Sequence, residues 1–306
     1  MRATSNTEKI LDNFSHKDNL IDLIRVFRSS LIELQFIRAN KNMLDEKIKA
    51  TSSSGVTDIV TAADNYIEQK LRDQINELYP DWGFWGEETI DKFEHKPKYV
   101  VVDPIEGTKN FKTYREEHWG SVIALIDENR PVIGIVGYPN ANKMLVGLKN
   151  NGAYELEINS TNNNKDLDLR PVNPSIFRDE FTYNFSPHFE QDIIDQANKF
   201  KQLGEVVGHE DGSDKIAKLR ESIKIDGKIF RDFESGAIEA ILNRGTIYFK
   251  TSAEMAAVYV IINELGGKVS TFEATDWSIN ADTMVSARSI KDYNYLMCLV
   301  KKIKEL

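Results

Sequence analysis

The chain has 306 residues, of which 41% are hydrophobic and 28% charged, as is ordinary for a globular protein. Its formal net charge of -9 argues against a nucleic-acid polymer as partner, because phosphate backbones are bound by lysine and arginine. The single cysteine, Cys298, excludes an intramolecular disulfide and a cysteine-based zinc site, and its apolar neighbours predict a place in the core. The N-terminus lacks the apolar core of a signal peptide and no apolar run reaches membrane-spanning length, so we expect a cytoplasmic protein without membrane contact.

The first half of the chain mixes helices and strands. The spacing of apolar residues predicts helices at 17–40 and 61–78, the second with Ala62, Tyr66, Ile67 and Leu71 facing the core. The stretch TSSSG between the two helices is typical of a mobile loop. A strand at 99–102, two strands within 119–139 and a hairpin at 143–157 follow, the last around a strong Asn-Gly turn signal.

The second half begins with a polar connection at 162–173. The pattern after it predicts a strand at 180–185, helices at 188–202 and 233–243, a strand at 245–249, a helix at 253–265, a strand at 283–287 and a helix at 290–304. Gly266 suits the left-handed C-terminal cap of the third of these helices. This order predicts an α/β (α+β) layered sandwich with an N-terminal subdomain, 1–160, and a C-terminal subdomain, 161–306.

Acidic residues gather at strand ends and helix starts. The stretch VVVDPIEGT at 100–108 ends an apolar strand in two carboxylates three positions apart, which repel each other unless a cation lies between them. Magnesium prefers such oxygen ligands, and no His-x-x-x-His or cysteine pattern competes for a softer metal. The acidic candidates are Asp64, Glu87, Glu88, Asp103, Glu106 and Glu254.

Most of these residues, taken alone, also have a structural explanation. Asp64 follows Thr61 at the spacing of a capping box, and Glu254 suits the positive end of a helix. Paired glutamates such as Glu87 and Glu88 are usually solvated surface. Only the stretch 103–108 favours chemistry by itself.

In combination the motifs resemble the inositol monophosphatase family. VVVDPIEGTKNF is similar to its signature Asp-Pro-Ile/Leu-Asp-Gly-Thr-x-x-Phe, and DIVTAAD and WGEE precede it in the family's order. AEMAAVYVIINELGG is similar to the late helix that begins Trp-Asp-x-Ala-Ala. The resemblance covers most of 45–290 and implies a layered αβαβα sandwich. The superfamily also includes 3'(2'),5'-bisphosphate nucleotidases and fructose-1,6-bisphosphatases.

The resemblance implies a Mg2+-dependent hydrolase that attacks a small phosphate monoester with a metal-activated water. The substrate would be an inositol phosphate, a sugar phosphate or a 3'-phosphonucleotide, the cofactor two or three Mg2+ ions with Mn2+ as a substitute, and the assembly a homodimer. The implied metal ligands are Glu87, Asp103, the Ile105 carbonyl, Glu106 and Glu254. The implied catalytic residues are Asp64, Glu87 and Thr108, and the implied phosphate contacts are Gly107 and Thr108. Glu88 is expected to point elsewhere.

The sequence departs from the family pattern at the metal ligands. Glu106 and Glu254 stand where the family has Asp, and each added methylene moves a carboxylate by about 1.5 Å. The alternative function is therefore a family member that binds a phosphorylated ligand with weak or no turnover. Lys250 lies where inositol phosphatases carry an acidic residue, which favours a more anionic substrate with Lys109 and Lys250 as candidate contacts.

Overall fold

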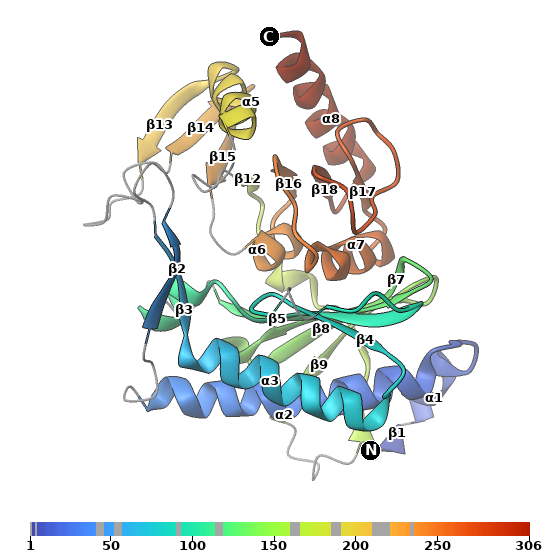
Figure 1. Ribbon diagram of the computed structural model, residues 1–306. Helices are drawn as coiled ribbons and strands as arrows, with labels where there is room; N and C mark the ends of the chain where they lie inside the picture. Colours follow the sequence, from blue (N-terminus) through green and yellow to red (C-terminus); the bar gives the residue numbers. More distant parts are fainter. Residues whose placement is uncertain are drawn as a thin grey trace.

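The protein folds into alternating layers of helices and sheets, which confirms the predicted αβαβα sandwich (Figure 1). The computed structural model describes residues 2–3, 5–40, 46–51, 57–89, 93–113, 119–159, 166–184, 191–209, 221–232 and 236–306. Three hydrophobic clusters fill the spaces between successive layers.

The outer helical layer consists of α2 (Lys17–Ala39) and α3 (Ala62–Leu78), with the short α1 (Ser5–Leu11) beside them. The buried stripe of α3 runs through Ala63, Ile67, Leu71 and Ile75 at four-residue spacing. The prediction that Ala62 and Tyr66 face the core is therefore wrong, because both lie one position off that stripe. Ala62 is exposed, and the half-exposed Tyr66 donates its hydroxyl to Glu33 Oε1 at 2.6 Å.

The first sheet has seven strands in the order β11-β9-β8-β7-β6-β5-β4. They are β4 (Gly83–Gly86), β5 (Lys98–Glu106), β6 (Gly120–Asp127), β7 (Arg130–Tyr138), β8 (Lys143–Leu148), β9 (Gly152–Glu157) and β11 (Arg170–Pro171). The predicted strand pairs at 119–139 and 143–157 are confirmed as antiparallel hairpins. The strand predicted at 99–102 is longer than expected and continues to Glu106 across a bulge.

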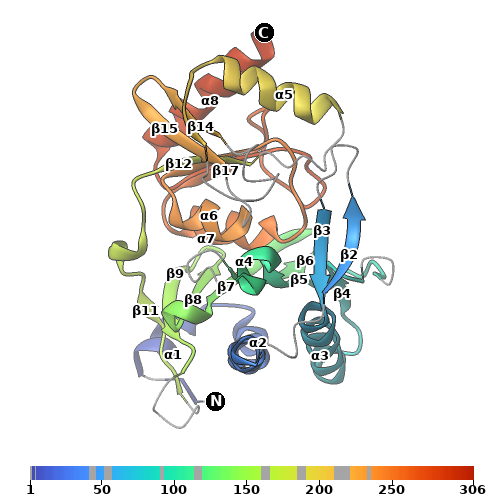
Figure 2. The same ribbon diagram turned by 90° about the vertical axis from the view of Figure 1, so that its left-hand side faces the viewer.

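The middle layer consists of α6 (Gly236–Leu242) and α7 (Met255–Glu264), which lie between the two sheets (Figure 2). Helix α7 packs directly on glycines of the first sheet. A Cβ atom at Gly134 would come within 2.6 Å of the Ala257 carbonyl oxygen, and one at Gly147 within 2.8 Å of the Ile261 backbone. The absence of side chains at these two positions lets α7 approach β7 and β8 closely and places its N-terminus, with Glu254, over this sheet. Gly266 ends the helix region in the expected left-handed conformation, with φ 83°.

The second sheet has the order β13-β14-β15-β12-β16-β18-β17. Its strands are β12 (Phe181–Asn184), β13 (Glu205–His209), β14 (Glu221–Ile225), β15 (Lys228–Asp232), β16 (Gly245–Tyr248), β17 (Lys268–Ser270) and β18 (Met284–Ala287). Its outer face is covered by α5 (Gln191–Gln202) and α8 (Ile290–Glu305). The beginnings of two predicted helices, 188–190 and 233–235, lie outside the described residues.

Cys298 is exposed, so its predicted place in the core is wrong. Helix α8 buries Leu296, Leu299, Val300 and Ile303, and Cys298 lies on the opposite face of this stripe. Apolar sequence neighbours did not reveal the face on which the cysteine lies, because a helix separates adjacent residues by about 100°.

Among the described residues, two short strand pairings lie outside the two large sheets. One joins β2 (Glu46–Thr51) to β3 (Thr57–Thr61), which leads into α3 and lies next to α4 (Thr108–Lys112) (Figure 2). The other joins β1 (Arg2–Ala3) to β10 (Asp166–Leu167). Of the loop expected at 51–55, residue 51 ends β2 and the rest lies outside the described residues.

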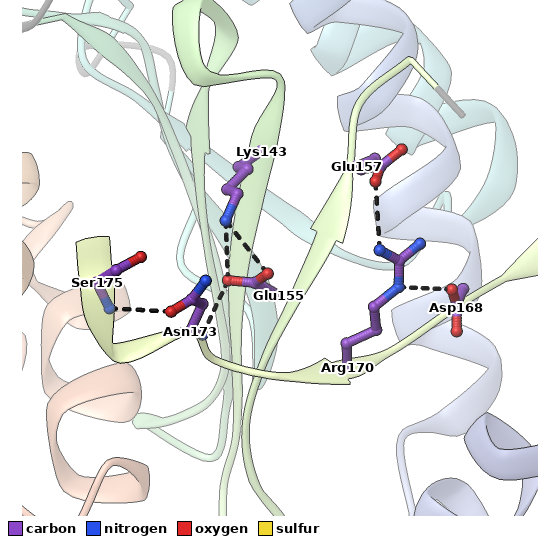
Figure 3. Close-up of polar contacts among 7 residues, drawn as sticks. All are labelled: Lys143, Glu155, Glu157, Asp168, Arg170, Asn173 and Ser175. Atoms are coloured by element: carbon purple, nitrogen blue, oxygen red, sulfur yellow. Dashed lines mark hydrogen bonds and ion pairs between the residues drawn. The ribbon is translucent and has the colours of Figure 1, made fainter. Parts of the chain in front are cut away.

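The connection to the second half is tied to the edge of the first sheet by polar contacts (Figure 3). Arg170 forms ion pairs with Glu157 at 3.2 Å and with Asp168 at 2.7 Å, next to the β11–β9 pairing. Glu155 accepts the Asn173 amide at 3.0 Å and pairs with Lys143 at 3.2 Å. The polar sequence predicted as a connection thus adds a strand to the first sheet.

None of the helices within the described ranges combines the length and apolarity that membrane spanning requires.

Candidate active site

The candidate site lies where β4 ends beside the last part of β5. These two strands are parallel, with Gly86 opposite Val102, so their carboxyl ends meet at the same edge of the sheet. The Glu87 amide extends the pairing by donating to the Val102 carbonyl at 3.1 Å. Glu87 directly follows β4, and Asp103 lies at the same level on the neighbouring β5.

Asp103 and Glu106 are buried at this edge, with relative exposures of 4% and 6%. The strand bulges between them, and the Ile105 amide donates to Asp103 Oδ1 at 3.0 Å. The Ala237 amide of α6 donates to the Glu106 carboxylate. Asp103 also lies close enough to Glu106 and Glu87 for the charges of these carboxylates to raise its affinity for protons.

Burial raises the pKa of Asp103 well above its usual range, and the charges of Glu87, Glu106 and Glu254 raise it further. Burial also raises the pKa of Glu106 to about 8, with the charge of Glu254 as the next cause. The largest charge effects on both groups thus come from other carboxylates. A bound cation would relieve this repulsion.

The donor set fits a hard divalent cation in kind, because it consists of carboxylate and backbone carbonyl oxygens. Within the described ranges, no group of three or more His, Cys, Asp or Glu residues stands in a ready-made metal-binding arrangement.

Asp64 is both a capping residue and a partner of Thr108. Its Oδ2 accepts the Thr61 amide at 2.8 Å, while the Thr61 hydroxyl accepts the Ala63 amide at 3.2 Å, which completes the predicted capping box. Its Oδ1 accepts the Thr108 hydroxyl at 3.2 Å. Burial raises the pKa of Asp64 to about 6, and the charge of Glu87 contributes in the same direction.

The turn after β5 depends on Gly107, whose φ of 81° is a conformation that favours glycine. Helix α4 begins at the next residue, Thr108, and the Phe111 amide donates back to the Gly107 carbonyl at 3.0 Å. The Thr108 hydroxyl lies 3.1 Å from the Ile105 carbonyl as well as near Asp64. Its single proton can serve only one of these acceptors at a time.

Glu254 is the N-cap of α7, directly before Met255, and its side chain makes no capping hydrogen bond. A carboxylate at this positive helix end also agrees with the structural explanation, which needs no capping contact. The Ser252 hydroxyl donates to the Glu254 carboxylate, and the charge of Glu254 acts on Asp103 and Glu106 across the layer. The structure thus brings a residue about 150 positions downstream to the β5 bulge.

The remaining predicted residues are placed less directly. Lys250 forms an ion pair with Asp282, and the side chain of Lys109 lies outside the described residues. Substrate contact by either lysine stays a prediction. Glu88 donates its backbone amide to Glu68 Oε2 at 2.8 Å, and the direction of its side chain likewise stays a prediction.

Two contacts at the site were not predicted. No feature of the sequence singles out the Ala237 amide, because every residue except proline carries a backbone amide. Glu68 had a signal, since it follows Asp64 by four residues and so lies on the same face of a predicted helix.

The chain is a layered αβαβα sandwich whose candidate site consists of carboxylates at one edge of the first sheet. Residues 28–305 match the model of the inositol monophosphatase family, and the chain belongs to that family. Inositol monophosphatase 2 of Saccharomyces cerevisiae is 33% identical over 135 residues, which are 43% of this chain and 44% of that protein. Inositol monophosphatase 1 of the same yeast is 27% identical over 251 residues, or 78% of this chain and 77% of that protein.

The fold comparison agrees with the sequence comparison. The solved structure of an IMPase from Thermotoga maritima matches with a TM-score of 0.65 and 20% identity, covering 94% of this chain and 98% of that one. At this identity the likeness shows the fold alone.

Proposed function

We propose that this protein hydrolyses a small phosphate monoester with Mg2+ and a water molecule as nucleophile. The observation that carries the proposal is a group of mutually repelling carboxylates beside a Thr108–Asp64 hydrogen bond. In this group Asp103 and Glu106 are buried, Glu254 is partly buried and Glu87 is exposed. The family, whose members are phosphatases that generally depend on metal ions, supports the same reaction class.

Glu87, Asp103, the Ile105 carbonyl, Glu106 and Glu254 would hold two or three Mg2+ ions, and Mn2+ would be a substitute. When bound, these ions neutralise phosphate charge and lower the pKa of a bound water. Cation binding favours the ionised carboxylates, so it would release the protons that the raised pKa values of Asp103 and Glu106 retain.

Thr108 and Asp64 would orient and deprotonate the attacking water. When the Thr108 hydroxyl donates to Asp64 Oδ1, its oxygen keeps lone pairs that accept a hydrogen bond from water. Asp64 has a pKa of about 6, which suits a proton acceptor near neutral pH. Helix α3 thus fixes Asp64, Asp64 fixes the Thr108 hydroxyl, and this hydroxyl would orient the attacking water.

The phosphate would bind at the backbone of Gly107 and Thr108. The left-handed Gly107 leaves no Cβ on this side of the turn, and the amides at the start of α4 would donate to phosphate oxygens. Lys109, which follows directly, is the candidate contact for a second phosphate or another anionic group.

The substrate classes that remain are an inositol phosphate, a sugar phosphate and a 3'-phosphonucleotide. Lys250 already pairs with Asp282, so an anionic substrate would have to compete for it. A panel of these three classes, assayed for phosphate release with Mg2+ and with a chelator, tests the proposal. Release that needs Mg2+ for at least one class supports it. No release from any class, at any Mg2+ concentration, contradicts it.

The second candidate function is ligand binding with weak or no turnover. It is favoured by Glu106 and Glu254, whose side chains are longer than the family's Asp. Saturable binding of a panel compound, measured by calorimetry, without phosphate release would select this function. We also propose a homodimer by analogy with the family, which light scattering of the purified chain tests.

A further inference from the structure

Glu68 is a buried carboxylate outside the proposed ligand set. It lies on α3 one turn after Asp64, and its side chain is only 1% exposed. Asp64, Glu68 and Arg72 follow one another at four-residue spacing, so all three point from the same face of the helix. A buried carboxylate is costly unless hydrogen-bond and charge partners compensate it, so its partners indicate its role.

The Glu68 carboxylate holds the two residues that follow Glu87. Its Oε2 accepts the Glu88 amide at 2.8 Å, and its Oε1 accepts the Thr89 hydroxyl. Arg72 Nη2 lies 3.6 Å from Oε1 and donates to the Thr89 hydroxyl. We call this set, the Glu68 carboxylate, Arg72, the Glu88 amide and Thr89, the Glu68 clamp.

The clamp fixes the Glu87 backbone together with β5. On one side the Glu87 amide donates to the Val102 carbonyl, and on the other the next amide, that of Glu88, donates to Glu68. Gly86 leaves room for this arrangement, because a Cβ atom there would come within 2.2 Å of the Glu68 carboxyl carbon. Glu87 is thus held at both neighbouring peptide groups.

We propose that Glu68 is a positioning residue for Mg2+ binding: through the Glu88 amide and Thr89 it holds Glu87 so that the Glu87 carboxylate reaches Asp103. This inference rests on the proposed function. Hydrogen bonds to a charged acceptor are stronger than those to a neutral one, so a carboxylate holds this turn more rigidly than an amide would. Helix α3 thereby positions two parts of the site, Thr108 through Asp64 and Glu87 through Glu68.

The test uses Glu68→Gln, which keeps the shape of the side chain and loses one of its two acceptor oxygens. The matched control is Glu77→Gln, which removes one negative charge from an exposed position of the same helix. For each protein, melting temperature is measured against Mg2+ concentration. We expect Glu68→Gln to raise the half-maximal Mg2+ concentration about tenfold or more, the usual effect of losing an outer-shell partner, and Glu77→Gln to leave it unchanged.

A purely structural role for Glu68 would lower the melting temperature without Mg2+ and leave the half-maximal Mg2+ concentration unchanged. That result overturns the inference while leaving the proposed function intact. A wild-type protein that shows no Mg2+-dependent shift overturns the proposed function, and the inference with it. Turnover at saturating Mg2+ should recover in Glu68→Gln, because the variant keeps every ligand.

A second pair of variants covers the case in which Glu68→Gln does not fold. Thr89→Ala removes the hydroxyl that Glu68 and Arg72 share, and Thr89→Ser keeps it. Thr89→Ala should raise the half-maximal Mg2+ concentration severalfold, and Thr89→Ser should restore the wild-type value. Equal values for the two variants contradict the clamp.

Discussion

At the scale of single residues, Asp64 serves two partners with its two oxygens. Its Oδ2 caps α3 through Thr61, and its Oδ1 accepts the Thr108 hydroxyl. The structural and the chemical explanations of this residue are therefore compatible, and they can be separated by experiment.

Thr108→Ala should lower kcat with little change in KM, because it removes a hydroxyl proposed to act in the transition state. Thr108→Ser keeps the hydroxyl and should retain most of the activity. Steady-state kinetics at saturating Mg2+ measures both. A Thr108→Ala enzyme with the kcat of wild type would exclude the hydroxyl from water activation.

Asp64→Asn separates catalysis from capping. Asn keeps one acceptor oxygen, which suffices for Thr61 at the helix start, and cannot take up a proton. We therefore expect most activity to be lost and the melting temperature to fall by only a few degrees. Lost stability with full activity per folded molecule would leave Asp64 a capping residue alone.

Asp103→Asn should remove most Mg2+-dependent phosphate release, because it deletes a charged ligand without changing shape. A 100-fold loss corresponds to about 2.7 kcal/mol of transition-state stabilisation. In a chelator the same variant should melt at a higher temperature than wild type, because one member of a repelling buried group is gone. Near-normal turnover of the variant would mean that Asp103 does not bind the metal.

At the scale of elements, the β5 bulge and the α7 start decide whether the longer Glu106 and Glu254 suit the site. The Ala237 amide of α6 donates to the Glu106 carboxylate, so the surrounding backbone accommodates the longer side chain. Shortening it would withdraw the carboxylate by about 1.5 Å.

We therefore predict that the double variant Glu106→Asp, Glu254→Asp hydrolyses substrate more slowly than wild type. The measurement is the turnover number at saturating Mg2+. A faster double variant would contradict this prediction. It would show that the natural site is impaired and would favour the ligand-binding function.

Much of the fold was predictable because its signals are local. Apolar periodicity predicted α2, and the Asn-Gly turn predicted the β8–β9 hairpin. The face of a helix on which a residue lies was harder to predict, as the exposed Tyr66 and Cys298 show. The site was predictable where acidic residues follow strands. The Ala237 amide and the Glu68 clamp depend on tertiary contacts between backbone and side chain, for which a single sequence offers few signals.

At the scale of the whole molecule, the buried acids make stability depend on pH and on cations. The pKa of Glu106 rises from 4.5 to about 8, and that of Asp64 from 3.8 to about 6, so the folded protein holds protons that the unfolded chain has lost. The free energy of unfolding contributed by these groups is greatest below their unfolded pKa values and falls as pH rises through the folded ones.

We predict that the metal-free melting temperature decreases from about pH 5 to about pH 8 and that Mg2+ largely reverses the decrease. Asp292 and Glu273, whose pKa values are lowered, act in the opposite sense only below this window. Glu106→Gln, which stays neutral, should flatten the slope in a chelator. A melting temperature that rises across the window in wild type would contradict the proposed proton storage.

The central claim is that the carboxylate cluster with raised pKa values is the cation site, and calorimetric titration of the metal-free protein with Mg2+ tests it most directly. Titrations in two buffers of different ionisation enthalpy count the protons exchanged. We predict saturable binding that releases protons near neutral pH, releases fewer at higher pH, and is strongly weakened in Asp103→Asn. Binding without proton release, or binding that Asp103→Asn leaves unchanged, would contradict the claim.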